Sequence, residues 1–227
     1  VLLGGLIRLF LLKETLSPNP LKNGQRAGVE SFKETYETIA NSTTSIKHLI
    51  ILSSFFMFCF HFEVLLRAVY AMNIKGLTTL EWGLIVSTSQ VMSLAATFII
   101  GWLIDSYGRK RVFTYSIAFL GVAVYLFSIS NTFSSFLISM AIITTCEQSR
   151  IMALQVLIAD STPRPVRGRV FSVISILNNI GSSTSILLSG LLYDLNPILP
   201  FYTSTLMYSL ATLFAIRFLH EVEERHI

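Results

Sequence analysis

Charged and amide side chains lie inside long apolar stretches of this chain, where their cost makes them informative about function. Glu63 and Arg67 are four residues apart and Glu147 and Arg150 are three apart, so each pair can share one helix face. Two interpretations stay open: a carboxylate handles protons or solute, or each carboxylate and arginine neutralise one another. The candidate pathway residues are His61, Glu63, Arg67, Gln90, Glu147, Gln148, Arg150, Asn178 and Asn179.

The elements that must position these residues are membrane-spanning helices. Hydrophobic residues make up 52% of the 227-residue chain and charged residues only 13%, too few to cover the surface of a soluble protein of this size. A spanning helix needs about 20 mostly apolar residues. Six stretches qualify and predict an all-α membrane protein with a six-helix bundle, namely 48–70, 82–104, 112–130, 136–158, 170–192 and 198–216.

The basic residues predict which side each loop occupies. Of the 17 Lys and Arg residues, Arg67 and Arg150 fall inside spans, and Arg8 lies in residues 1–12, a short apolar segment that is left out of this count. Thirteen of the other fourteen share one side and only Lys75 lies opposite, so the positive-inside rule places both ends of the chain in the cytoplasm. We therefore expect a multi-pass protein of the cell membrane. Topology explains the net charge of +4, and no nucleic-acid partner is expected.

Composition divides the chain into four parts. Residues 1–12 are apolar, too short to span a bilayer and without an initial Met, so we interpret them as the end of a truncated preceding transmembrane helix. Residues 13–47 are polar and predict a cytoplasmic linker. Residues 48–216 hold the six-helix bundle, and residues 217–227 form a cytoplasmic tail.

A distinctive motif follows the second span, where residues 101–111 read GWLIDSYGRKR. Gly101 would let a neighbouring helix approach closely, and Asp105 can pair with basic groups or a helix N-terminus. Gly108 permits a tight reversal, and the basic residues after it anchor the loop in the cytoplasm. A second loop, residues 160–169, reads DSTPRPVRGR.

The first loop resembles the signature loop of the major facilitator superfamily, and the second resembles a loop that precedes the fifth or eleventh helix in many members. The resemblance implies half of a twelve-helix transporter, here the C-terminal half, with an N-terminal six-helix half as its missing partner. It also implies a cytoplasmic gate formed by these loops; a basic anchor without a switching role is the alternative. The gate residues would be Gly101, Asp105, Gly108, Arg109, Lys110, Asp160, Arg167 and Arg169.

Polar residues recur across the two triplets of spans. The first and fourth spans carry charges, the second and fifth carry amides, and the third and sixth, 112–130 and 198–216, carry neither. This order predicts two three-helix inverted repeats, as in this superfamily. The third and sixth helices should then face lipid, and the other four should line a cavity.

Smaller features have packing interpretations. Gly181, Ser185 and Ser189 recur every four residues and predict close packing against another helix. His61 is interpreted as a hydrogen-bonded packing residue, although it can titrate near neutral pH. Arg67 has the alternative of reaching the outer interface by snorkelling.

These features favour a secondary transporter that moves a small solute by alternating access, with proton coupling through Glu147 or Glu63. Drug or metabolite efflux is slightly favoured over uptake. The alternative is a transport-inactive member acting as a sensor or scaffold. An enzyme is not expected, because hydrolase and metalloprotease motifs are missing. Neither a cofactor nor a metal is expected, since the four His residues are widely scattered.

Overall fold

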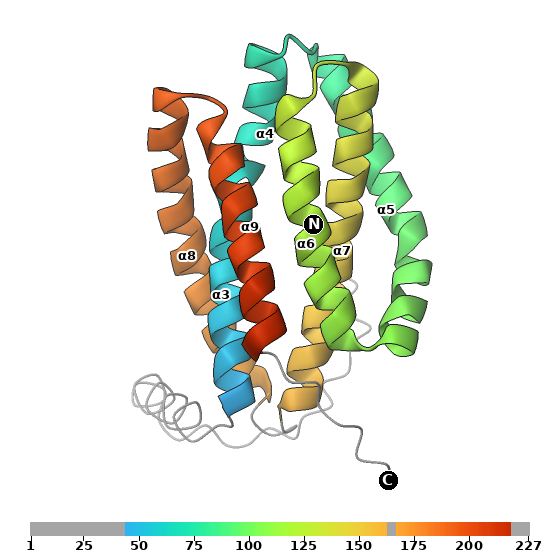
Figure 1. Cartoon of the computed structure of the whole chain (residues 1–227), viewed down its shortest axis with the longest axis vertical. Helices are drawn as coiled ribbons and strands as arrows, with labels where there is room; N and C mark the ends of the chain where they lie inside the picture. Colours follow the sequence, from blue (N-terminus) through green and yellow to red (C-terminus); the bar gives the residue numbers. More distant parts are fainter. Residues whose placement is uncertain (1–43, 163–166, 219–227) are drawn as a thin grey trace, which may run out of the picture. The chain divides into compact units, whose positions relative to one another are not determined.

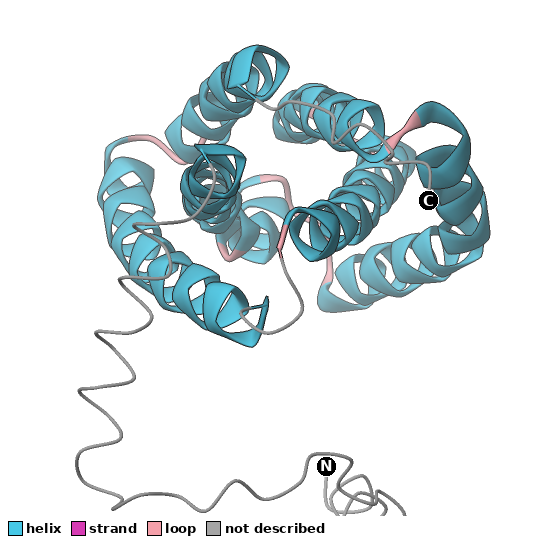
Figure 2. Ribbon diagram, turned by 90° about the horizontal axis from the view of Figure 1, so that it is seen from below, coloured by secondary structure: helices cyan, strands magenta, loops and turns pink. Residues whose placement is uncertain are grey.

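The computed structural model describes residues 44–162 and 167–218, and within these ranges all regular structure is helical (Figure 1; Figure 2). The interpretation of residues 1–12 as the end of a helix lies outside the described residues. The same holds for most of the predicted linker at 13–47 and most of the tail at 217–227. These assignments stay predictions.

Six helical rods make up the described part of the chain. The first rod is α3 (Thr44–Val64), continued by α4 (Leu66–Val69) and the π-helix η1 (Tyr70–Ile74). It continues four residues past the predicted end of the span at residue 70. It ends before Gly76, whose φ of 76° favours glycine. The other rods are α5 (Thr79–Tyr107), α6 (Arg109–Ile129), α7 (Phe133–Ser161), α8 (Arg167–Leu195) and α9 (Leu199–Phe218).

Five of these rods are long and apolar enough to cross a membrane. The remaining rod, α7, has the required length of 29 residues. Its centre carries Glu147, Gln148 and Arg150, which reduce its apolar character. The predicted spans therefore correspond to the six rods, and most rods run a turn or less beyond them. Capping residues fix the starts of α5 and α7. Thr78, for example, begins α5 by accepting a hydrogen bond from the Glu81 backbone N–H at 3.2 Å.

The packing of the rods repeats after three helices. In the first repeat the order is the α3–η1 rod, α5 and α6, and in the second it is α7, α8 and α9. The first rod packs on α8 just as α7 packs on α5, and α3 packs on α9 just as α7 packs on α6. The third members, α6 and α9, pack on each other near the middle of Figure 1. Because three helices reverse the chain direction, the repeats are inverted, as predicted.

Aromatic side chains tie the end of the first rod to its neighbours. The Tyr70 ring lies 4.7 Å from that of Phe201 on α9, and the Phe127 ring on α6 lies 5.6 Å from Phe201. The Tyr70 hydroxyl donates to the Ser128 carbonyl oxygen at 2.7 Å. These contacts hold η1 in place and thereby fix the short helix α4, which carries Arg67 one turn earlier.

The small residues of α8 face α3, which confirms their predicted packing role. A Cβ on Gly181 would lie 3.4 Å from the Ser54 carbonyl oxygen. The Ser185 hydroxyl donates to the Phe58 carbonyl oxygen at 2.5 Å, and both Ser185 and Ser189 are buried. A larger side chain at Gly181 would force the two backbones apart.

Candidate functional site

Arg67 lies on α4 and pairs with Glu63, one turn earlier on α3, as their spacing predicts. Arg67 Nε lies 2.5 Å from Glu63 Oε2, and Arg67 Nη2 lies 2.6 Å from Glu63 Oε1. Glu63 is fully buried and Arg67 is 4% exposed. The alternative that Arg67 snorkels to an interface does not hold, because two charge-assisted hydrogen bonds keep the guanidinium inside the bundle.

A second carboxylate reaches the same guanidinium from α7. Arg67 Nη2 lies 2.7 Å from Glu147 Oε1. The expected pairing of Glu147 with Arg150, three residues along α7, does not form among the described residues, because Glu147 turns toward Arg67 instead. One arginine thus bridges two carboxylates from different rods. We call Glu63, Arg67 and Glu147 the charged cluster.

Arg150 lies beside this cluster but binds an aromatic face. Its guanidinium carbon is 3.9 Å from the centre of the Phe56 ring on α3, a cation–π distance. Arg150 is 3% exposed, and its Nε has no hydrogen-bond partner among the described residues. With both arginines and both carboxylates ionised, the four buried charges sum to zero. Arg150 is therefore the one of these four groups that makes no ion pair among the described residues.

Tyr208 of α9 also reaches the charged cluster, and the sequence analysis missed it. Its hydroxyl lies 3.4 Å from Glu63 Oε1, and its ring lies 5.5 Å from that of Phe56. The side chain is fully buried against Gly121 of α6, where a Cβ would come within 3.1 Å of Tyr208 Cβ. The predicted division into cavity-lining and bare helices was thus too strict, because α9 supplies a polar group to the centre.

Ser182 connects His61 of α3 to Asn178 of α8, where these two helices pack together. His61 Nδ1 lies 2.9 Å from both the Met57 carbonyl oxygen and the Ser182 hydroxyl, and that hydroxyl donates to the Asn178 carbonyl oxygen at 2.7 Å. These contacts support the packing interpretation of His61. The side-chain oxygen of Asn178 is buried and lacks a partner among the described residues.

The remaining predicted pathway residues do not join the charged cluster. Gln90 on α5 and Asn179 on α8 are exposed on the bundle, and Gln148 on α7 is half-buried. None of these amides makes a side-chain hydrogen bond within the described ranges. Exposed amides within long apolar helices fit a face that meets water or another polypeptide better than one that meets lipid.

The predicted gate residues gather at the end of the bundle where α5 meets α6. Gly108 joins these helices with φ 88°, a conformation that favours glycine. Arg109 Nε then lies 2.8 Å from Asp160 Oδ2 near the end of α7. Arg167 donates to the carbonyl oxygens of Ala159 and, at 3.3 Å, Thr162, and so caps α7.

Other gate residues behave differently from the prediction. Gly101 was expected to admit a close neighbour, yet a Cβ there would meet no atom of the described chain within 4 Å. Asp105 is exposed and pairs with none of the described basic groups, because Asp160 takes Arg109. Lys110 also makes no ion pair within the described ranges. The side chain of Arg169 lies outside what the structure describes.

Comparisons with known proteins agree with this arrangement. The sequence profile of the Major Facilitator Superfamily matches residues 49–226. The chain therefore belongs to this superfamily of membrane transporters, as its loops predicted.

Individual relatives are more distant. An uncharacterised membrane protein of Saccharomyces cerevisiae, YJR124C, is 25% identical over 130 residues, which cover 55% of this chain and 29% of the relative. The class H tetracycline resistance protein of Pasteurella multocida is 24% identical over 145 residues, which cover 64% of this chain and 36% of that protein. The chain thus spans about a third of the length of the curated relatives it matches.

A solved structure shares the fold. The crystal structure of the human organic anion transporter MFSD10 (TETRAN) superposes with a TM-score of 0.61 at 17% identity. The match covers 78% of this chain and 47% of that one. A match to about half of a transporter fits the prediction of a six-helix half.

Proposed function

We propose that the protein carrying this chain is a secondary active transporter that moves a small solute by alternating access, with Glu147 as its proton-exchanging group. The observation that carries the proposal is Arg67 bridging two carboxylates from separate rods inside the bundle. Breaking the Arg67–Glu147 contact removes the ion pair that joins α4 to α7, whereas the Arg67–Glu63 pair lies within the first rod. A proton that neutralises one carboxylate can therefore be linked to helix movement.

Glu147 can give up its contact with Arg67 more readily than Glu63 can in this arrangement. Glu63 is fully buried and makes two contacts with Arg67 and one with Tyr208. Glu147 makes one contact with Arg67, and 16% of its side chain is exposed. When Glu147 takes up a proton, Arg67 keeps Glu63 as its counter-ion, and Arg150 keeps its contact with the face of the Phe56 ring. Arg67 then loses its charge-assisted bond to α7.

The other parts of the proposal rest on the sequence and the relatives. This chain supplies six helices and would form one wall of the pathway, with another six-helix half forming the other. The Pasteurella relative is a tetracycline resistance protein, which supports export over uptake. The distribution of basic residues supports cytoplasmic ends for the chain.

The test is transport by the intact protein in liposomes under an imposed pH gradient. In the Glu147→Gln variant we expect substrate exchange to persist without a pH gradient while gradient-driven accumulation is lost, because the amide cannot exchange a proton. Cys146→Ala, a half-buried neighbour on the same helix turn, is the matched control and should keep gradient-driven accumulation.

Two results would count against the proposal. Unchanged pH-gradient dependence in Glu147→Gln would remove its proton role. Failure of the native protein to move any solute across a broad panel would favour the alternative of a sensor or scaffold.

A further inference from the structure

A second feature of the bundle is a groove between α6 and α9, away from the charged cluster. Its volume is about 420 Å³, and it lies at the end where α6 begins and α9 ends. The lining residues that matter for recognition are Lys110, Arg111, Tyr115, Ala118, Thr212 and Ile216. Two cations therefore lie at one end of a groove whose other walls are mostly apolar.

The charges in this groove are uncompensated within the described ranges. Arg109 has Asp160 as its partner, whereas Lys110 and Arg111 make no ion pair there. The Thr114 hydroxyl donates to the Lys110 carbonyl oxygen at 2.8 Å, and the Thr212 hydroxyl donates to the Tyr208 carbonyl oxygen at 2.8 Å. Because both threonine hydroxyls donate within their own helices, the two cations are the charged groups that would recognise a ligand.

The exposed surfaces of the two helices that form the groove suit hydrocarbon. Phe119 is 61% exposed on α6, and Leu206 and Leu213 are 62% and 63% exposed on α9. The surfaces of α5 and α8 also expose apolar side chains, but they include the amides Gln90 and Asn179, whereas α6 and α9 contain no amide side chain. Large apolar side chains that continue from a pair of cations match the chemistry of a phospholipid, with a charged headgroup above acyl chains.

We propose that this groove binds a membrane phospholipid with an anionic headgroup. Lys110 and Arg111 bind the phosphate, and an acyl chain runs past Tyr115 and Ala118 against Ile216. The site shares no residue with the charged cluster, and of the predicted gate residues it includes only Lys110.

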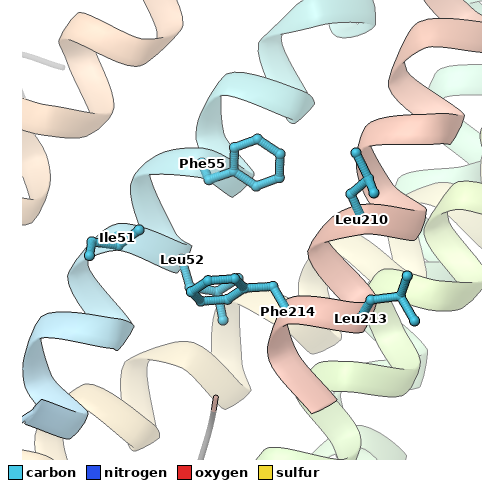
Figure 3. Close-up of a pocket in the computed structure, with 6 residues that line it drawn as sticks. All are labelled: Ile51, Leu52, Phe55, Leu210, Leu213 and Phe214. Atoms are coloured by element: carbon cyan, nitrogen blue, oxygen red, sulfur yellow. The ribbon is translucent and has the colours of Figure 1, made fainter. Parts of the chain in front are cut away.

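A neighbouring groove provides an internal comparison. It lies between α3 and α9, has a volume of about 470 Å³ and is lined by Ile51, Leu52, Phe55, Leu210, Leu213 and Phe214 (Figure 3). None of these lining residues is charged. An acyl chain that enters this groove should therefore do so without preference for its headgroup.

The test uses the intact protein in phosphatidylcholine nanodiscs with a trace of photoactivatable lipid. The probes are phosphatidylglycerol and phosphatidylcholine carrying the same diazirine-labelled acyl chain. We expect phosphatidylglycerol to label residues 115–118 and 212–216 more strongly than phosphatidylcholine does. The expected ratio is about fivefold for each cation that contacts the headgroup. Labelling of the groove between α3 and α9 should be equal for the two lipids.

Three variants sharpen the test. Lys110→Gln combined with Arg111→Gln should reduce phosphatidylglycerol labelling to the phosphatidylcholine level. Arg217→Gln removes an exposed cation at the same end that does not line the groove, and should preserve most of the preference. Ala118→Phe fills the apolar part and should lower labelling by both lipids, which keeps the proposal testable if the double variant fails to fold.

Several results would overturn the proposal. Equal labelling by the two lipids would do so, as would a preference that survives loss of both cations. Complete competition by soluble glycerol phosphate would indicate a free phosphate as the ligand. The segment after α9 contains Glu221, Glu223 and Glu224. Labelling that appears only after deletion of residues 219–227 would assign the groove to that acidic segment.

Discussion

Two arginine–carboxylate contacts hold α7 to its neighbours, and they differ in burial far more than in length. Arg67 lies 2.7 Å from Glu147, with side-chain exposures of 5% and 16%. Arg109 lies 2.8 Å from Asp160, and each side chain is 37% exposed. The separation of charges is nearly the same, so Coulomb attraction at equal dielectric would be nearly the same.

Burial makes the two contacts energetically different. Breaking the inner one leaves a charge without water or a partner, which is strongly unfavourable. Water can replace either partner in the outer one at little cost. The inner contact should therefore move only when a proton or solute compensates it, whereas the outer one can open and close freely.

Both contacts lie on one rigid rod. Glu147 and Asp160 are 13 positions apart on α7, a distance of about 20 Å along a helix. A movement of α7 that follows release of Glu147 would therefore also displace Asp160 from Arg109. In the proposed transport cycle, α7 links the middle of the bundle to the end where the loops lie.

The largest effect is expected from removing the cation at the centre. Arg67→Gln leaves the fully buried Glu63 without its cation partner, and should lower the free energy of unfolding by about 3–5 kcal/mol. Thermal unfolding of the purified protein in detergent measures the loss. Adding Glu63→Gln to this variant should recover much of the stability, because it removes the fully buried carboxylate and leaves Glu147 and Arg150 as charges of opposite sign. If the Arg67→Gln variant has the same unfolding temperature as the native protein, the cluster is not buried as described.

The half of this cluster that lies on one rod could be predicted from the sequence. Glu63 and Arg67 are four residues apart, and an α-helix places such residues next to each other in any fold. The six spans were predictable for a similar reason, because a bilayer imposes one length and one composition on every helix. Gly108 was predictable because the reversal between two helices restricts its backbone.

Contacts between rods could not be predicted in the same way. Glu147 is 80 residues from Arg67, so their contact depends on how α4 and α7 pack. Spacing favoured Arg150 as its partner, but nothing in the spacing indicated that the Phe56 ring would bind Arg150. Tyr208 was overlooked because an aromatic ring reads as apolar, although its hydroxyl needs a partner when it is buried. The Arg109–Asp160 pair again joins two rods.

An intermediate effect is expected where α9 meets the cluster. Tyr208→Phe removes a hydroxyl 3.4 Å from Glu63 while keeping the ring that packs on Phe56. We expect a loss of about 0.5–1.5 kcal/mol in the free energy of unfolding, as for a typical hydrogen bond. Tyr202→Phe, an exposed tyrosine on the same helix, is the matched control and should leave stability unchanged. A loss as large as that of Arg67→Gln would mean that Tyr208 is an essential partner of the buried charges.

The smallest effect on stability is expected at the outer contact. A double-mutant cycle with Arg109→Gln and Asp160→Asn should give a coupling of about 0.2–1 kcal/mol. The coupling should nearly vanish in 1 M salt, where the screening length is about 3 Å. An energy of this size suits a gate, because about 1 kcal/mol changes the ratio of two states roughly fivefold. Both single variants should therefore fold normally yet change the rate of solute exchange in liposomes. Native exchange kinetics in both would leave the pair as a surface anchor, and a coupling above about 2 kcal/mol would erase the difference between the inner and outer contacts.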